Sequence, residues 1–207
     1  EVVLKNISFT LKKNDKVILL GRSDLAKTVL LDILSGKIKP DSGSFTWGIT
    51  TTQAYLPTDN SEYFEGEPLS LVNWLRQYSK LKEETFIRGF LGKMLFTGEE
   101  TLKLCNVLSG GEKVRCMLSR MMLQNANCLI LDEPTNHLDL ESITAFNNAL
   151  KDFPGTVLFA SHDHEFVQTV ANRIVELTPK GYIDKLMSFD DYLSSEQIKE
   201  QAAAMYS

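Results

Sequence analysis

Short apolar runs alternate with stretches of helical periodicity along much of this chain. Residues 16–20, 128–131 and 156–160 are almost wholly apolar, and helix-like patterns over 25–35 and 140–150 follow the first two runs. Apolar runs of this length, separated by helices, are typical of strands buried on both faces of a parallel sheet. The pattern therefore predicts an α/β fold, with a mostly parallel sheet core flanked by helices.

The remaining segments predict further strands near the N-terminus and helices in the middle of the chain. Residues 2–10 and 51–56 are expected to be strands, and residues 40–48 a turn that leads into a strand. From residue 69 to 105 the pattern changes to helices with polar breaks. The expected packing residues of this region are Trp74, Phe90, Leu91, Met94, Leu95 and Phe96.

Another helix is predicted over residues 110–124. A stripe of apolar side chains follows it at helical spacing, and such a stripe is typical of a surface that faces the core. The stripe consists of Val114, Met117, Leu118, Met121 and Met122. From residue 189 onward the chain is expected to form a polar helical tail whose last residues, QAAAMYS, are weakly anchored.

Composition narrows the class of protein. The 207 residues suit one domain with a large core, and 43% hydrophobic with 24% charged residues is typical of a globular protein. No run approaches the roughly 18 apolar residues of a membrane-spanning helix, so we expect no membrane insertion and a cytoplasmic location. The net charge of −5 argues against an autonomous nucleic-acid binder. The three cysteines lack metal-type spacing and are expected to be reduced core residues.

Residues 21–28, GRSDLAKT, have the spacing of a phosphate-binding loop. Such a loop follows a strand and opens a helix, so that backbone N–H groups point at an anion. Gly21, Lys27 and Thr28 match the pattern G-x-x-x-x-G-K-[ST], and Ala26 replaces its second glycine. Ala26 is tolerable if its backbone is helical. Asp24 adds a carboxylate beside a polyphosphate, so we expect it to lower nucleotide affinity unless it points outward or contacts Mg²⁺.

Two longer stretches resemble ATP-binding cassette ATPases. LSGGEKVR at 108–115 is similar to their signature motif, and LILDEPTNHLD at 129–139 to their Walker B motif. The ending NHLD, with SHDHEF at 161–166, is most similar to the ABC-F branch, whose members are tandem-cassette proteins associated with the ribosome. The resemblance implies a P-loop NTPase-type core with an antiparallel β portion. It also implies one domain over residues 1–207, with a helical subdomain inserted at about 60–108 and a tail over 189–207.

The resemblance assigns roles to individual residues. Glu133 would be the general base that polarises water, and His162 would contact the γ-phosphate of ATP. Thr28 would ligate Mg²⁺, and Asp132 would hold it through water. The nucleotide-binding residues would be Gly21, Arg22, Ser23, Asp24, Leu25, Ala26, Lys27 and Thr28.

The signature has a different role in this family, because it closes over the nucleotide of a partner cassette. The partner would be a second cassette, in the same polypeptide or in a homodimer. The signature residues are Ser109, Gly110, Gly111 and Glu112. The D-loop residues, which would cross the same interface, are Asn136, His137, Leu138 and Asp139.

The glutamine loop of the family is a second departure. AYLPT at 54–58 puts Thr58 where relatives carry a glutamine that ligates Mg²⁺. Gln53 is expected to be a strand residue, and Asp59 or Asn60 could supply the oxygen ligand instead. Phe9 is a candidate for the aromatic residue that stacks on adenine, although that residue could also precede residue 1.

Three functions fit these observations. The leading interpretation is an ABC-F cassette that binds and hydrolyses ATP as half of a nucleotide-sandwich dimer and acts on the ribosome. The second is the ATP-binding subunit of a membrane transporter, in which a permease would be the partner. The third is an ATP-dependent clamp or regulatory cassette with weak hydrolysis. Asp24, Ala26 and Thr58 favour it, whereas the intact Asp132, Glu133 and His162 oppose it.

Overall fold

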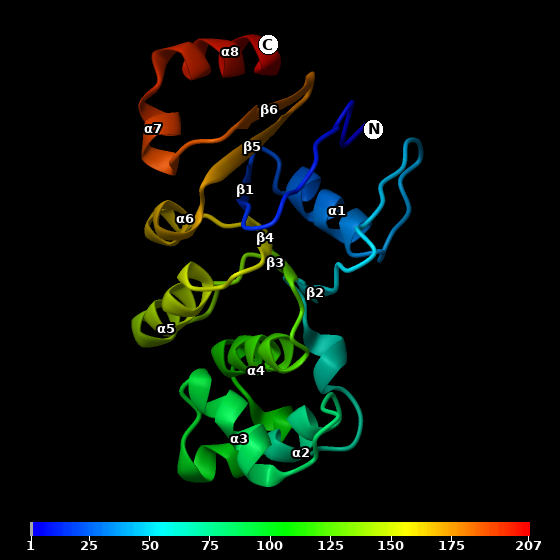
Figure 1. The fold of residues 1–207 in the computed structure, drawn as a ribbon, viewed down its shortest axis with the longest axis vertical. Coiled ribbons are helices and arrows are strands. Elements are labelled where there is room, and N and C mark those ends of the chain that lie inside the picture. Colours follow the sequence, from blue (N-terminus) through cyan, green and yellow to red (C-terminus); the bar gives the residue numbers. More distant parts are fainter. Residues whose placement is uncertain (1) are drawn as a thin grey trace.

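In the computed structural model, which describes residues 2–207, the described chain is built on a six-stranded sheet (Figure 1). The strand order is β2-β3-β4-β1-β5-β6, with β1 to β5 parallel and β6 antiparallel to β5. The strands are β1 (Lys16–Leu20), β2 (Gln53–Leu56), β3 (Cys128–Asp132), β4 (Thr156–Ala160), β5 (Arg173–Thr178) and β6 (Gly181–Lys185). The predicted mostly parallel α/β fold is confirmed.

Helices cover both faces of this sheet, with α1 on one side and α5 and α6 on the other (Figure 1). The predicted helices over 25–35, 110–124 and 140–150 are confirmed to within one residue at each end. The α-helices are α1 (Asp24–Leu34), α2 (Leu71–Arg76), α3 (Glu84–Lys93), α4 (Gly110–Leu123), α5 (Leu140–Lys151), α6 (His164–Val170), α7 (Phe189–Ser194) and α8 (Glu196–Tyr206). Short 3-10 turns lie at Ser61–Phe64, Gly98–Leu102 and Cys105–Val107.

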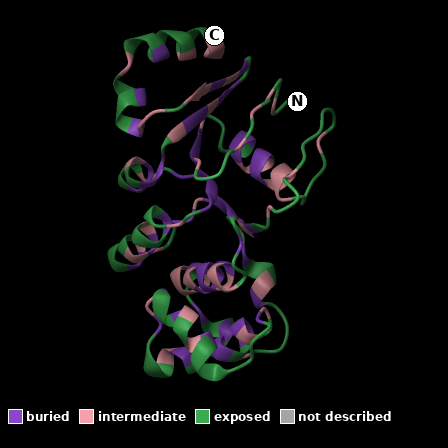
Figure 2. Ribbon diagram, viewed as in Figure 1, coloured by how far each residue is buried: buried purple, intermediate pink, exposed green. Residues whose placement is uncertain are grey.

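The central strands are buried on both faces, which explains their unbroken apolar runs. Val17 and Leu19 of β1 pack in one cluster with Leu30 and Leu31 of α1, whereas Ile18 packs in the other cluster on the opposite face. Successive side chains of a strand point to opposite faces, so a strand covered by helices on both sides needs apolar residues at every position. The buried residues in Figure 2 follow these central strands.

The predicted strand over residues 2–10 is wrong, and the segment 40–48 contains no strand of its own before β2. Both segments lie outside the ladders of the described sheet, and Asn6 has a left-handed φ of 53°. They face each other across a groove of about 1290 Å³, so their backbones do not pair. Residues 4, 7, 9 and 11 still turn apolar side chains toward the α1 cluster, which produced the strand-like pattern.

The middle of the chain forms the expected helices, and the methionine-rich stripe of α4 is core. Trp74, Leu91, Met94 and Phe96 are buried, and Phe90 is half-buried against them. The cysteines are confirmed as core residues, since all three are buried and free. Within residues 2–207, no helix combines the length and the apolarity that crossing a membrane requires.

Arg173 joins the N-terminal segment to the edge hairpin of the sheet. Its guanidinium donates to Asp15 Oδ2 at 2.7 Å and to both carboxylate oxygens of Asp184, at 2.9 and 2.6 Å. A fourth bond reaches Thr10 O at 2.8 Å. The hydrogen bonds to Asp184 raise the pKa of Arg173 further above its ordinary value, and the side chain is only 12% exposed. A fork of this kind is stronger than an exposed ion pair.

Replacing Arg173 by Leu should therefore destabilise the fold, because it leaves two carboxylates near the protein interior without their cation. We expect a loss of about 3 kcal/mol in the free energy of unfolding, measured by urea denaturation. Lys199→Ala is the matched control, because it breaks the exposed ion pair with Glu196 and should cost less than about 0.5 kcal/mol. Equal effects of the two substitutions would contradict this account.

Candidate functional site

The predicted site residues from three strands meet at one edge of the sheet. β1 leads into Gly21, β3 ends at Asp132, and β4 is followed by Ser161 and His162. Because the strands are parallel, their carboxyl ends lie together, and the register pairs Asp132 with Ala160. Ligands of open α/β sheets bind outside such carboxyl ends, where neighbouring connections diverge.

The phosphate-loop sequence forms a tight turn into α1. Gly21 has φ +144°, and a Cβ there would lie 2.8 Å from the Leu177 carbonyl oxygen, so only glycine fits. Ser23 caps α1, and its side chain accepts a hydrogen bond from Ala26 N. Ala26 lies inside the helix, so its methyl group is tolerated as expected. Sequence reasoning missed the contact with Leu177, because a backbone carbonyl leaves no signal in the sequence.

The Asp24 carboxylate lies between the side chains of Lys27 and His162. Its Oδ1 is 2.7 Å from Lys27 Nζ and 3.1 Å from His162 Nε2. Lys27 is buried, whereas the Asp24 side chain is 72% exposed. The carboxylate therefore sits at the mouth of the loop, on the two side chains that the family resemblance assigns to the terminal phosphates.

The hydrogen bond from Lys27 keeps the pKa of Asp24 below its ordinary value of 3.8, with a further contribution from His162. The folded-state pKa is depressed, so the carboxylate is charged at every pH above that ordinary value. Asp24 is thus a permanent negative charge at neutral pH, tethered in the phosphate loop.

Glu133 follows β3 and faces His162. One carboxylate oxygen accepts a hydrogen bond from His162 N at 3.2 Å, and the other lies 3.4 Å from His162 Nε2. The side chain is 13% exposed, and burial raises its pKa above the ordinary 4.5, which makes it a stronger base. The backbone of Glu133 is left-handed, with φ +48°, a conformation that costs a non-glycine residue about 1 kcal/mol or more.

Thr28 and Asp132 provide oxygen atoms that suit magnesium. The Thr28 hydroxyl donates to Asp132 Oδ2 at 2.7 Å, and Asp132 is buried. Magnesium prefers such hard oxygen ligands and usually keeps several waters and substrate phosphates. No group of three or more His, Cys, Asp or Glu side chains in residues 2–207 could hold a metal alone. The two residues fit an ion that arrives with a polyphosphate.

Thr58 lies at the same edge, beyond the end of β2. β2 runs parallel to β3, so Thr58, two residues after the end of β2, lies at the carboxyl edge at which Glu133 follows β3. Gln53 is confirmed as a strand residue at the start of β2. Of the two substitutes, Asn60 is buried, and Asp59 is exposed and accepts a hydrogen bond from Ser61 N at 2.9 Å.

The signature begins α4 as a capping box. Ser109 Oγ accepts from Glu112 N at 3.2 Å, and Glu112 Oε2 accepts from Ser109 N at 2.8 Å. Lys103 forms an ion pair with Glu112 at 2.6 Å. Among residues 2–207, no hydrogen bond or ion pair joins the signature to the phosphate loop. The structure thus brings together the loop, Asp132, Glu133 and His162, and leaves the signature apart from them.

The D-loop packs against the signature within the chain. A Cβ on Gly111 would lie 2.3 Å from His137 O, so that position admits no side chain. His137 is left-handed, with φ +66°, and Asp139 caps α5 by accepting from Ser142 N at 2.8 Å. Gly111 therefore has an intramolecular role that is independent of any partner.

Phe9 does not stand free as an aromatic platform. It is half-buried in the cluster around α1, so its ring already packs against the protein. The arrangement of residues 21–28 indicates no other residue for stacking on adenine.

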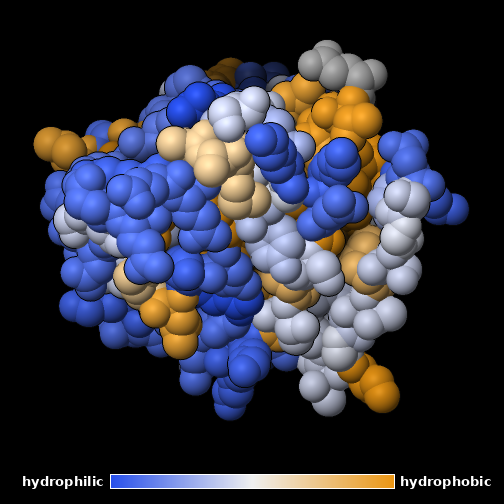
Figure 3. All heavy atoms as spheres, turned by 90° about the horizontal axis from the view of Figure 1, so that it is seen from above, coloured by the Kyte–Doolittle hydropathy of each residue, from blue (hydrophilic) through white to orange (hydrophobic). Residues whose placement is uncertain are grey.

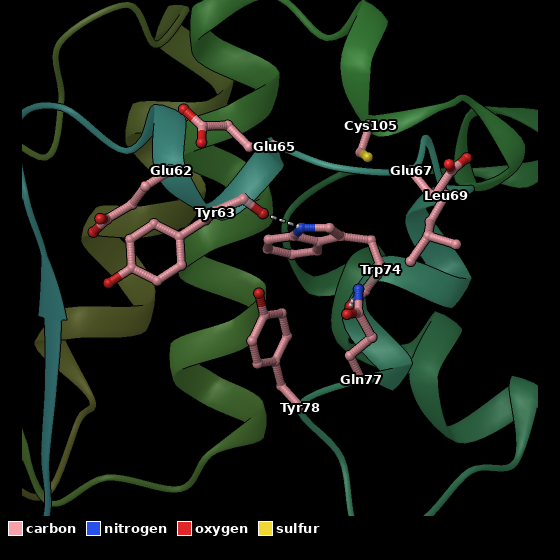
Figure 4. Close-up of a pocket in the computed structure, with 9 residues that line it drawn as sticks. All are labelled: Glu62, Tyr63, Glu65, Glu67, Leu69, Trp74, Gln77, Tyr78 and Cys105. Atoms are coloured by element: carbon pink, nitrogen blue, oxygen red, sulfur yellow. Dashed lines mark hydrogen bonds between the residues drawn. The ribbon is translucent and has the colours of Figure 1, made fainter.

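A separate pocket of about 470 Å³ lies in the helical region (Figure 4). Trp74 is at its centre and donates from Nε1 to Tyr63 O at 2.7 Å. The guanidinium of Arg120 lies over the rings of Tyr63 and Tyr78, at 4.7 and 4.5 Å from their centroids. Since these ring faces are covered, we interpret the pocket as a packing feature. Its lining residues are Glu62, Tyr63, Glu65, Glu67, Leu69, Trp74, Gln77, Tyr78 and Cys105.

Comparison with known proteins agrees with this geometry. A family model described as "ABC transporter" matches residues 4–136. The chain is 60% identical over 205 residues to the uncharacterized ABC transporter ATP-binding protein YkpA of Bacillus subtilis, covering 99% of this chain and 38% of that protein. It is 31% identical over 188 residues to the energy-dependent translational throttle protein EttA of Escherichia coli, covering 88% of this chain and 33% of that protein.

A solved structure shares the fold. The ATP-binding cassette MJ0796, determined as a dimer in a post-hydrolysis state with ADP and Pi, superposes with a TM-score of 0.71 at 18% identity. The match covers 89% of this chain and 90% of that chain. The present chain spans well under half of the length of YkpA and EttA. With the family match across the phosphate loop and the Asp132–Glu133 turn, the chain belongs to the ATP-binding cassette ATPases of the ABC transporter family, whose members bind and hydrolyse ATP.

Proposed function

We propose that this cassette binds Mg²⁺-ATP at residues 21–28 and hydrolyses it as one half of a two-cassette clamp of the ABC-F type. The observation that carries the proposal is that Lys27 and His162 contact one anion position, where Asp24 now lies, and that Glu133 lies beside His162. Phosphoryl transfer needs mainly positioned cations and an acceptor for the proton of water, and these residues supply both.

Each residue has a distinct part in this proposal. Lys27 and the N–H groups at the start of α1 bind the phosphates. Thr28 and Asp132 hold Mg²⁺, which supplies charge neutralisation on the phosphates when it is bound. Glu133 orients the attacking water and accepts its proton, and His162 positions Glu133 through the contacts at 3.2 and 3.4 Å.

The second cassette completes the site in this proposal. The signature of this chain lies apart from its own phosphate loop, so it is available to close over the nucleotide of the other cassette. EttA is named for an action on translation, which supports a ribosomal role for the longer protein. YkpA is named as a transporter ATP-binding protein, which supports a permease partner instead. Cosedimentation of the longer protein with ribosomes in ATP distinguishes the two, since a transporter subunit would stay in the supernatant.

Glu133→Gln should abolish turnover while ATP still binds, because the amide keeps the shape of the side chain but accepts no proton. We expect a fall in kcat of about 100-fold or more, measured by phosphate release. Since the pKa of Glu133 is raised above 4.5, wild-type kcat should decrease as the pH falls through that raised value and the carboxylate gains a proton. The variant should lack this acidic limb.

Glu141→Gln is the control, because Glu141 is an exposed acid in the first turn of α5. It should leave both the rate and the pH profile unchanged. Hydrolysis by Glu133→Gln at the wild-type rate would show that Glu133 is not the base.

Asp24→Asn and Asp24→Gly should both tighten ATP binding, by about tenfold, because each removes a charge that competes with the phosphates for Lys27 and His162. Isothermal titration with ATP measures the effect. Lowering the pH is no substitute for these variants, because the pKa of Asp24 is below its ordinary value and the carboxylate stays charged in mildly acidic solution. The gain should shrink as salt screens this exposed charge.

Two matched variants test the cause. Asp24→Glu keeps the charge and should not tighten binding. Asp41→Asn removes an equal charge from an exposed loop residue and should also have no effect. If Asp24→Asn binds ATP no better than the wild type, charge competition at the loop is refuted.

A further inference from the structure

The last turn of the C-terminal helix is held firmly, so the expectation of a weakly anchored end is wrong. Tyr206 Oη donates to Glu176 Oε1 at 2.9 Å and lies 3.1 Å from Leu177 O. Two residues before Tyr206, the carbonyl of Ala204 accepts a hydrogen bond from Lys180 Nζ at 3.1 Å. Figure 1 shows α8 running across the edge of the sheet that β5 and β6 form.

Glu176 of β5 accepts a hydrogen bond from each of the two C-terminal helices. Its second carboxylate oxygen accepts a hydrogen bond from Tyr192 Oη of α7 at 2.5 Å. Burial and the bond to Glu176 raise the pKa of Tyr206 to about 12, so its hydroxyl stays protonated and remains a donor at neutral pH. Viewed from this end, the surface is largely hydrophilic, with apolar side chains gathered at one side (Figure 3).

The ring of Tyr206 is in contact with the phosphate loop. The guanidinium carbon of Arg22 lies 4.0 Å from the ring centroid, well inside the range of a cation–π contact. The Arg22 side chain thereby reaches toward α8, although Arg22 belongs to the proposed phosphate loop. Arg22 is exposed, so the ring is what orients it.

The same tyrosine is linked to the first residue of the loop. The Leu177 carbonyl beside Tyr206 Oη is the group that leaves no room for a Cβ on Gly21. The register of β1 with β5 pairs Leu20 with Glu176, so the loop leaves the sheet directly beside the residues that hold Tyr206. Gly21 and Arg22 are therefore both supported by one small cluster, made of Glu176, Leu177 and Tyr206.

We propose that Tyr206 is a positioning residue for nucleotide binding, which fixes the start of the phosphate loop and couples the docking of α8 to occupancy of the site. The inference rests on the proposed nucleotide site at residues 21–28. A phosphate loop binds through backbone N–H groups that must point inward, so holding Gly21 and Arg22 in place lowers the cost of ordering the loop. The coupling is reciprocal, and a bound nucleotide should hold α8 more firmly.

The test compares Tyr206→Ala, Tyr206→Phe, Arg22→Ala and the Arg22→Ala/Tyr206→Ala double variant, by titration with ADP, which fills the loop without turnover. Tyr206→Ala should weaken ADP binding about threefold to fivefold, the range of an exposed cation–π contact. Tyr206→Phe keeps the stacking and should lose less. Arg22→Ala should add little to the loss in the Tyr206→Ala background, because the two residues act through one contact.

Tyr192→Phe is the matched control, since it removes the other hydrogen bond to Glu176 without touching Arg22. It should leave ADP affinity unchanged, whereas a merely structural role of this end of the chain would predict a loss in both variants. In ATP hydrolysis, Tyr206→Ala should raise KM and leave kcat nearly unchanged, as expected for uniform binding.

Hydrogen exchange provides the reciprocal measurement. ADP should slow exchange in the last turn of α8 in the wild type, and this effect should disappear in Arg22→Ala. Unchanged ADP affinity in a folded Tyr206→Ala variant would overturn the inference while leaving the proposed function intact. Absence of ADP and ATP binding by the wild type would instead overturn the proposed function, and the positioning role with it.

Discussion

The parallel pairing of β1 with β4 and of β4 with β3 is the constraint on which the site depends. Hydrogen bonds fix the register of these strands, and the register decides which residues emerge together at the carboxyl edge. A slip of one residue would turn every apolar side chain of a strand to the other face. Both faces are closely packed, so such a slip would put side chains of the wrong size and shape into each position. The packing of the core thereby maintains the positions of the candidate site residues.

At that edge the charges are arranged around a carboxylate that belongs to the chain itself. Lys27 is buried and needs an anion, and Asp24 supplies one from three residues away. An incoming phosphate must replace an existing ion pair, so its net gain is smaller than its contacts suggest. On the proposed assignment, Glu133 and the Thr28–Asp132 pair are in place, whereas Asp24 would lower the affinity of the loop for phosphate. The proposed clamp would then engage only at substantial nucleotide concentrations.

The sequence predicted those parts of the fold whose physical cause is local. Unbroken apolar runs predicted β1, β3 and β4, and the spacing of Gly21 and Lys27 predicted the tight turn at residues 21–28. The strand prediction for residues 2–10 was wrong because a half-buried segment also alternates apolar and polar side chains. A strand requires, in addition, a neighbouring strand to which its backbone hydrogen-bonds. The contact of Asp24 with His162 spans 138 positions, and the stacking of Arg22 on Tyr206 joins opposite ends of the chain. Such contacts depend on how distant elements meet, which neither periodicity nor spacing encodes.

The left-handed backbone of Glu133 has a consequence for how this protein can change over generations. Glycine adopts φ +48° without penalty, so the backbone at this position is more stable with the one residue that has no carboxylate. Glu133→Gly would relieve this strain, and the resulting cassette, which the proposed mechanism makes inactive, would keep a backbone at least as stable at this position. With Glu133 as the proposed base, selection for stability alone would favour a cassette that binds nucleotide without turnover, and a requirement for hydrolysis would retain the glutamate.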